Sequence, residues 1–298
     1  MELPELRAKV AEAHRVYQAA RYDDVVALLP DLLAAVEDFP GRRNGLRQEA
    51  LLSYVSAYVV AAKLVTKLGA GDLAILAADR AATAAVDADS LSARGLAAYQ
   101  VACALLRMDQ LDDAERVAVI MAEELTAAAR SDDPHIVSIG GALWLIAAVI
   151  AARKTDRGEA WARLAHADTL AGLLGEDGNF GWTGFGPTNV AIHRISVAAE
   201  LGDAGEALRV AAVVDPDRMP PGLLSRRAQV SLDLAWAQAQ RKRDAEATLH
   251  LLEAERIAPQ VIRHNVIAQE IIREMLARGT RRHTTELTRL AQRAGVLQ

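Results

Sequence analysis

A short phrase recurs along this chain. A turn residue is followed by an acidic residue and then by a small residue that opens an apolar segment. Two clear copies are Gly158-Glu159-Ala160 and Gly205-Glu206-Ala207, and related copies begin at Tyr22, Gly71, Asp112 and Ala245. The copies are spaced by about 40 to 49 residues, which is typical of repeats built from two helices. The phrase therefore predicts stacked helical pairs that bury a common core.

The recurring phrase has a physical reason. An acid in the first turn of a helix meets the positive end of the helix dipole, and a small residue beside it lets two helices cross closely. The composition agrees, because 52% of residues are hydrophobic but only 4% are aromatic, and no long segment alternates with period two. We predict an all-α chain: a right-handed α-solenoid of about seven tetratricopeptide-like (TPR-like) hairpins that form a single domain over residues 1–298.

The apolar periodicity and the turn residues place both helices of each pair. The first helices are expected near 3–20, 43–68, 90–107, 135–153, 188–201, 223–241 and 260–278. The second helices are expected near 23–38, 72–87, 111–130, 157–174, 204–214, 244–257 and 284–294. Pro30 is expected to interrupt the helix near 23–38, and Pro259 is expected to begin the helix near 260–278.

Charge and composition exclude several classes. The net charge is −5 and no basic stripe is present, so we expect no binding of DNA by this chain alone. Cys103 is the single cysteine, which excludes an intramolecular disulfide and a cysteine zinc site. The uncharged run at 136–152 is just short of a membrane span of about 20 residues, and a central helix of the solenoid fits it better. With no secretory signal pattern, we expect a cytoplasmic protein.

No catalytic motif stands out. His166 and Asp168 are two residues apart and so do not face each other on a helix. The phosphate-binding, zinc-protease and nucleophile-elbow motifs are missing from the sequence. We therefore predict that the chain is not an enzyme and has neither a catalytic residue, a cofactor nor a metal site.

One irregular segment breaks the repeat at residues 175–187. It is rich in glycine, yet it holds Phe180, Trp182 and Phe185. A loop of this length is unusual within a compact array. Its aromatic side chains either plug the loop onto the helices or line a ligand pocket, and the sequence leaves both open.

Several phrases together resemble a known family. They are FGPTNVAIH at 185–193, ELGD at 200–203, LAWAQ at 234–238, LLEAE at 251–255 and the opening YQAARYD at 17–23. This combination resembles the C-terminal region of helix-turn-helix regulators of the Cro/repressor (XRE) type in high-GC bacteria, and it covers nearly the whole chain. The resemblance implies a regulatory module that responds to a small molecule or peptide, expected as a homodimer. The DNA-binding domain of that family is expected to be absent here, so that DNA would be reached only through such a domain.

The first helices of a solenoid line its concave face, and half of the scarce aromatics fall on them. Asn189 and His193 are four residues apart on the helix after the glycine-rich loop, where they can hydrogen-bond a ligand. The candidate ligand-binding residues are Tyr54, Tyr58, Tyr99, Trp144, Trp182, Phe185, Asn189 and His193. Each residue also has an alternative that involves no ligand. The aromatic side chains would pack between helices, Asn189 would cap its own helix, and His193 would lie in the core.

The resemblance, together with the predicted helical array, implies the ligand- or peptide-sensing and oligomerisation domain of a transcriptional regulator, with its effector expected in the concave groove. The alternative is a constitutive TPR-like scaffold for protein–protein interaction without a small ligand. A well-formed apolar pocket favours the first, and a long open polar groove favours the second.

Overall fold

The computed structural model describes residues 2–39, 45–278 and 285–297, and within these ranges it contains helices and no strand. The all-α prediction is confirmed. The α-helices are α1 (Leu3–Gln18), α2 (Tyr22–Glu37), α3 (Arg47–Lys67), α4 (Gly71–Asp87), α5 (Leu91–Arg107), α6 (Leu111–Ala128), α7 (Pro134–Arg153), α8 (Arg157–Leu174), α9 (Pro187–Glu200), α10 (Ala204–Ala211), α11 (Leu224–Gln240), α12 (Asp244–Ile257), α13 (Pro259–His264), α14 (Val266–Ala277) and α15 (Thr285–Arg293). Two short 3-10 helices are η2 (Phe180–Trp182) and η3 (Pro216–Arg218).

Two details differ from the predicted boundaries. The single helix expected at 260–278 is divided into α13 and α14 at Asn265, whose side chain accepts a hydrogen bond from the Ala268 amide at 3.1 Å and caps α14. Pro30 does not interrupt its helix, because α2 continues through it with Leu29 and Leu32 both buried. Tertiary burial therefore outweighs the loss of one backbone hydrogen bond there.

The turn inside each of six pairs repeats one backbone geometry. Its middle residue has a positive φ, between 57° and 82°, at Ala20, Gly69, Asp109, Thr155, Gly202 and Lys242. An acid then falls in the first turn of the next helix, as expected. The small residue of the phrase is fully buried at Ala74, Ala114, Ala160, Ala207 and Ala247. The repeated phrase is thus a hairpin turn followed by a close helix crossing.

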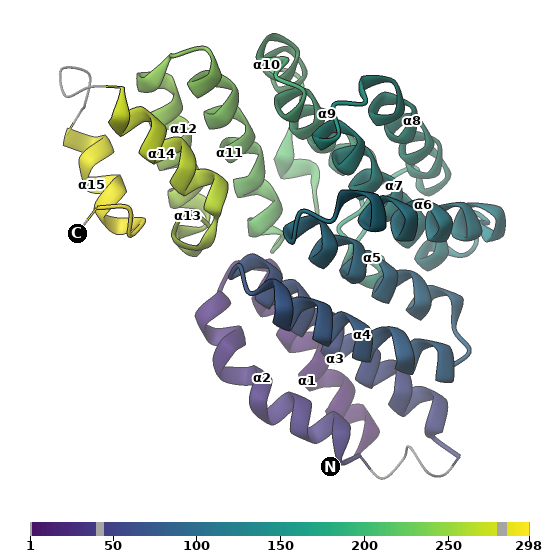
Figure 1. Ribbon diagram of the computed structural model, residues 1–298. Helices are drawn as coiled ribbons and strands as arrows, with labels where there is room; N and C mark the ends of the chain where they lie inside the picture. The colour runs from purple at the N-terminus through teal and green to yellow at the C-terminus, as the bar shows by residue number, and fades with distance from the viewer. Residues whose placement is uncertain (1, 40–44, 279–284, 298) are drawn as a thin grey trace.

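The helices contact one another largely in chain order, and the pairs follow an arc (Figure 1). In addition α1 contacts α11, far along the chain. The Asp23 amide, at the start of α2, donates to Gln260 Oε1 on α13 at 3.0 Å, and Asp23 Oδ1 lies 3.7 Å from His264 Nε2. The pair α1–α2 therefore contacts α11 and α13, which lie far along the chain, so the arc is curved enough to bring these helices together.

Two helices, α3 and α7, are long and apolar enough to cross a membrane by length and composition alone. In the array, 67% of the apolar window of α3 and 83% of that of α7 lie buried among other helices. A buried core helix has this same composition, so the two helices are weak evidence for a span.

Candidate functional site

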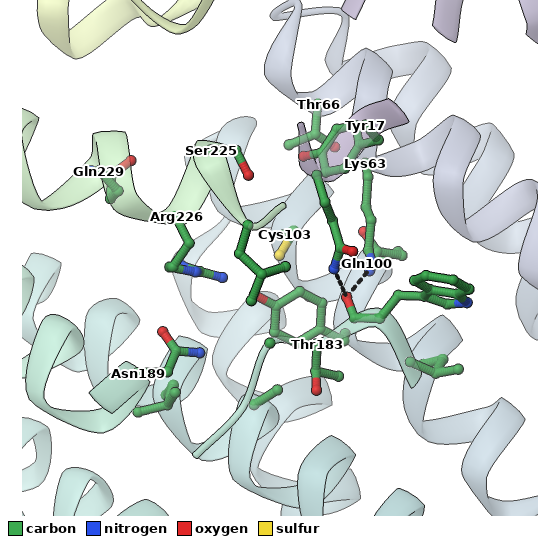
Figure 2. Close-up of a pocket in the computed structure, with 18 of the residues that line it drawn as sticks. Tyr17, Lys63, Thr66, Gln100, Cys103, Thr183, Asn189, Ser225, Arg226 and Gln229 are labelled. Carbon is green, nitrogen blue, oxygen red and sulfur yellow. Dashed lines mark hydrogen bonds between the residues drawn. The ribbon is translucent and has the colours of Figure 1, made fainter. Parts of the chain in front are cut away.

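A cavity of about 240 Å³ lies between the first helices of the pairs (Figure 2). Its walls come from α1, α3, α5, α7, α9 and α11, together with the glycine-rich segment 175–186 (the aromatic loop) and the residue before α11. Among the described residues that line it are three cations, Lys63, Lys67 and Arg226, and no carboxylate. The cavity therefore has a defined charge as well as a defined place in the fold.

Phe185 fastens the aromatic loop to the array. Its side chain is fully buried and lies on Gly141 of α7, where a Cβ atom would come within 1.9 Å of the ring. Gly141 is thus needed for the close approach of ring and helix. The Phe185 carbonyl also accepts from the Gly178 amide at 3.0 Å, which closes the loop on itself.

Trp182, three residues earlier, forms part of the cavity wall. Its ring stacks on His14 of α1, with centroids 4.9 Å apart and planes 3° from parallel. Its carbonyl oxygen accepts from Gln18 Nε2 at 3.3 Å and from Lys63 Nζ at 3.0 Å. The residue has a φ of 59°, which is strained for a large side chain, so several contacts combine to hold it there.

The loop also connects α1 to the centre of the array. The side-chain amides of Gln18 and Asn179 exchange two hydrogen bonds of 2.9 Å, across 161 residues of sequence. Asn179 Oδ1 accepts a third from the Gly184 amide at 3.2 Å. The loop is therefore a structural part of the cavity and not a loose connection.

Two amide side chains of the wall are buried without a partner. Gln100 on α5 is 2% exposed and Asn189 on α9 is 1% exposed. Gln100 Nε2 and Asn189 Oδ1 have no hydrogen-bond partner among the described residues. Figure 2 shows the Asn189 amide and the Arg226 guanidinium pointing into the same space. A buried polar atom left unpaired costs about 1–3 kcal/mol, so a hydrogen-bond partner at either atom would stabilise the fold.

The titratable side chains of the wall are held in defined states. Burial, reinforced by Arg226, lowers the pKa of His193 to about 3, so the ring is neutral, and its Nδ1 donates to the Asn189 carbonyl at 2.9 Å. Burial raises the pKa of Cys103 to about 11, against smaller effects of Tyr99 and the nearby cations. Burial likewise raises the pKa of Tyr99. Cys103 is therefore a protonated thiol, which is a poor nucleophile.

Four of the eight predicted site residues line this cavity: Tyr99, Trp182, Asn189 and His193. Asn189 does not cap its helix, because its Oδ1 has no partner among the described residues, and the Thr188 amide at the start of α9 donates to Asp177 Oδ1 at 2.9 Å instead. His193 is buried, as the core alternative requires, yet it also belongs to the cavity wall.

The other four lie outside the cavity. Tyr54 and Tyr58 pack together with ring centroids 4.6 Å apart, and the Tyr58 hydroxyl donates to Glu37 of α2 and accepts from Arg80 of α4 at 2.8 Å. Tyr58 therefore faces the second helices, and Tyr54 packs against its ring. Phe185 lies in the core against Gly141 and fastens the aromatic loop to α7.

Trp144 packs between helices as well. Its Nε1 donates to Thr126 Oγ1 of α6 at 2.9 Å, and its ring stacks on His166 of α8 at 4.5 Å. The predicted convergence of all eight side chains is thus not what the structure shows. For Tyr54, Tyr58, Trp144 and Phe185, the alternative of packing describes their positions.

Sequence reasoning missed the cations and Gln100. A signal was present for Lys63 and Lys67, which are four residues apart and share a face of an otherwise apolar first helix. Gln100 had a weaker one, as an amide next to Tyr99 on a first helix. Arg226 had none, because arginines at the start of a helix are usually solvated.

No group of three His, Cys, Asp or Glu side chains in the described ranges is placed to hold a metal ion. A scan against protein-family models finds no match to this chain, and a search of curated proteins finds none either. The resemblance to helix-turn-helix regulators therefore stays a prediction.

Proposed function

We propose that this helical array is a sensory module that binds a small effector in its central cavity. The observation that carries the proposal is a pair of buried amide atoms in the cavity wall, Gln100 Nε2 and Asn189 Oδ1, that have no hydrogen-bond partner among the described residues. A ligand with polar groups at these two places would satisfy both. The remaining wall is mostly apolar, aromatic or cationic, as small-molecule sites often are.

The size of the cavity supports a small molecule over a long peptide or a scaffold surface. About 240 Å³ corresponds to roughly eight water molecules at about 30 Å³ each. The walls come from six helices and one loop, so an occupant would contact elements from both ends of the chain. Binding would then change how firmly α1, α9 and α11 are held together.

In this proposal the array is a TPR-like, right-handed solenoid that acts as a homodimer and belongs to a transcriptional regulator. The six equivalent hairpin turns and the buried alanines support the TPR-like part. The regulatory part rests on the resemblance of sequence phrases. It would couple effector binding to DNA through a helix-turn-helix domain, since this chain carries no basic stripe of its own.

Native mass spectrometry of the protein purified from its own host tests the proposal. We expect a retained compound whose mass appears as a difference from the chain, and a mass of two chains for the dimer. Asn189→Ala should weaken binding several-fold to a hundredfold, because a lost hydrogen bond costs about 0.5–1.5 kcal/mol and an unsatisfied partner about 1–3.

Tyr58→Phe is the matched control, since Tyr58 lies outside the cavity, and it should retain the compound fully. Protein that carries no compound from its host, even after incubation with a host extract, would contradict the proposal.

A further inference from the structure

The charge of the cavity wall is uneven. Lys63, Thr66 and Lys67 all reach it from α3, and spacings of three and four residues place them on one face of that helix. Arg226 reaches the cavity from α11. Among the described residues neither Lys67 nor Arg226 forms a salt bridge, whereas the neighbouring Arg227 pairs with Asp217 at 3.0 Å. Within the described ranges, therefore, no salt bridge neutralises Lys67 or Arg226, although Arg226 forms a side-chain hydrogen bond with Tyr99.

The opposite wall is apolar. Helix α7 contributes only Ile139, Ala142 and Leu145 to the cavity. Helix α5 contacts both α3 and α7 and carries Leu96 and Gln100 between the two. The cavity therefore has a cationic side at α3 and α11 and an apolar side at α7.

The cations repel one another across this space. Burial lowers the pKa of Lys63 and of Lys67 to about 8, and the charge of Arg226 adds to both shifts. The carboxylate that acts on Lys67 is Asp233, which is not part of the wall and is held by Ser196 and by Gln229 Nε2 at 2.8 Å. At neutral pH all three cations carry charge that no carboxylate of the wall balances.

Within the part of the chain that the structure describes, polar atoms on the cationic side have hydrogen-bonding capacity that is not used. Lys63 Nζ uses one of its three donors on the Trp182 carbonyl. Thr66 Oγ1 is buried without a partner among the described residues. An acidic group on this side of the cavity would meet the positive charge of Lys63, Lys67 and Arg226, and the guanidinium fork suits carboxylate and phosphate.

We propose that the effector is an organic anion: a carboxylate or phosphate group that lies among Lys63, Lys67 and Arg226, joined to a compact apolar body that packs on α7. This inference rests on the proposed function and names the chemical class of its ligand. The polar atoms of Gln100 and Asn189 offer partners to hydrogen-bonding groups on the body of the ligand. Because rotation of an amide exchanges its donor and acceptor, each of these groups is of either kind.

The test uses defined probes on the full chain, measured by calorimetry at pH 7. Phenylacetate and phenyl phosphate carry an acidic group on an apolar ring, and phenylacetamide and phenethylamine are the neutral and cationic counterparts. We expect the two acids to bind at least about tenfold more tightly than the counterparts, because charge-assisted hydrogen bonds are among the stronger ones. Inorganic phosphate, which lacks the apolar body, should bind more weakly than phenyl phosphate.

Charge-removing variants locate the acidic group. Lys67→Gln and Arg226→Gln should each weaken phenylacetate binding by about tenfold or more and change the affinity for phenylacetamide less than about threefold. Arg256→Gln removes the same charge from an exposed pair with Glu253 and should leave both affinities unchanged. Circular dichroism confirms that each variant is folded.

The failures of the two proposals are distinguishable. Equal or tighter binding of the neutral or cationic probe, no binding of either acid, or no effect of Lys67→Gln and Arg226→Gln would each overturn the anionic class. A neutral compound retained from the host would do the same while the sensory proposal stands. A chain that retains no compound and binds none of the probes would overturn both.

Discussion

The contact of Phe185 with Gly141 offers the sharpest test of how the cavity is built. In a helix without neighbours, glycine to alanine stabilises by about 0.5–1 kcal/mol, because glycine loses more backbone freedom on folding. At position 141 the new methyl group would lie 1.9, 2.3 and 2.4 Å from three ring atoms of Phe185. The ring must retreat by more than about 1.5 Å to reach the 3.5–4.0 Å of ordinary carbon contacts.

The ring has no room to retreat within the core, since it is fully buried. Removing it from its place forfeits about 1.5–3 kcal/mol of burial, and overpacking it in place costs a similar 1–3 kcal/mol. After the helix gain is subtracted, Gly141→Ala should destabilise the protein by about 1–2 kcal/mol. Because Phe185 fastens the loop that carries Trp182, binding in the cavity should weaken as well.

Gly172→Ala is the matched control. Gly172 also lies within a helix, α8, and nothing stands within 4 Å of a Cβ atom there, so this variant should be more stable by about 0.5–1 kcal/mol. Urea unfolding followed by circular dichroism compares the two. In a Phe185→Ala background the Gly141→Ala change should become stabilising, because the clash is gone. If Gly141→Ala stabilises the unmodified protein as much as Gly172→Ala does, the packing argument is wrong.

Three further outcomes follow from the same structure. The pKa of His193 is about 3 in the folded chain against 6.5 for the free side chain. Below pH 6.5 the unfolded chain therefore binds a proton that the folded chain does not, and the free energy of unfolding falls with pH. Between pH 8 and pH 5 the wild type should lose about 2 kcal/mol more stability than His193→Asn, and parallel pH profiles of the two proteins in urea unfolding would contradict this. Tyr58→Phe should cost about 0.5–1.5 kcal/mol of stability, because it removes hydroxyl contacts to Glu37 and Arg80, and a loss of ligand binding in this variant would refute the placement of the cavity. With a net charge of −5, the chain alone should not shift duplex DNA in a gel at physiological salt. Sequence-specific retardation at micromolar protein would contradict the proposal that DNA is bound through a separate helix-turn-helix domain.

The sequence alone determined the local architecture of this protein. The acid-plus-small phrase encodes a hairpin turn and a close crossing within a short stretch of chain, so its spacing predicted the six regular pairs and most helix ends within a few residues. The aromatic loop was also visible, because glycines and aromatics together are rare in a helix. The division at Asn265 was missed, although an asparagine is a good N-cap and a Pro-started helix preceded it.

Only the tertiary structure decided which face of each helix turns inward. Along α3 the sequence shows two pairs that each share a face, Tyr54 with Tyr58 and Lys63 with Lys67. Tyr58 and Lys63 are five residues apart and so point about 140° away from each other at 100° per residue. Spacing cannot say which pair faces the cavity, since that depends on where α2, α4 and α5 pack. Tyr58, with Tyr54 packed against its ring, faces Glu37 and Arg80 on the second helices, and the two lysines line the cavity.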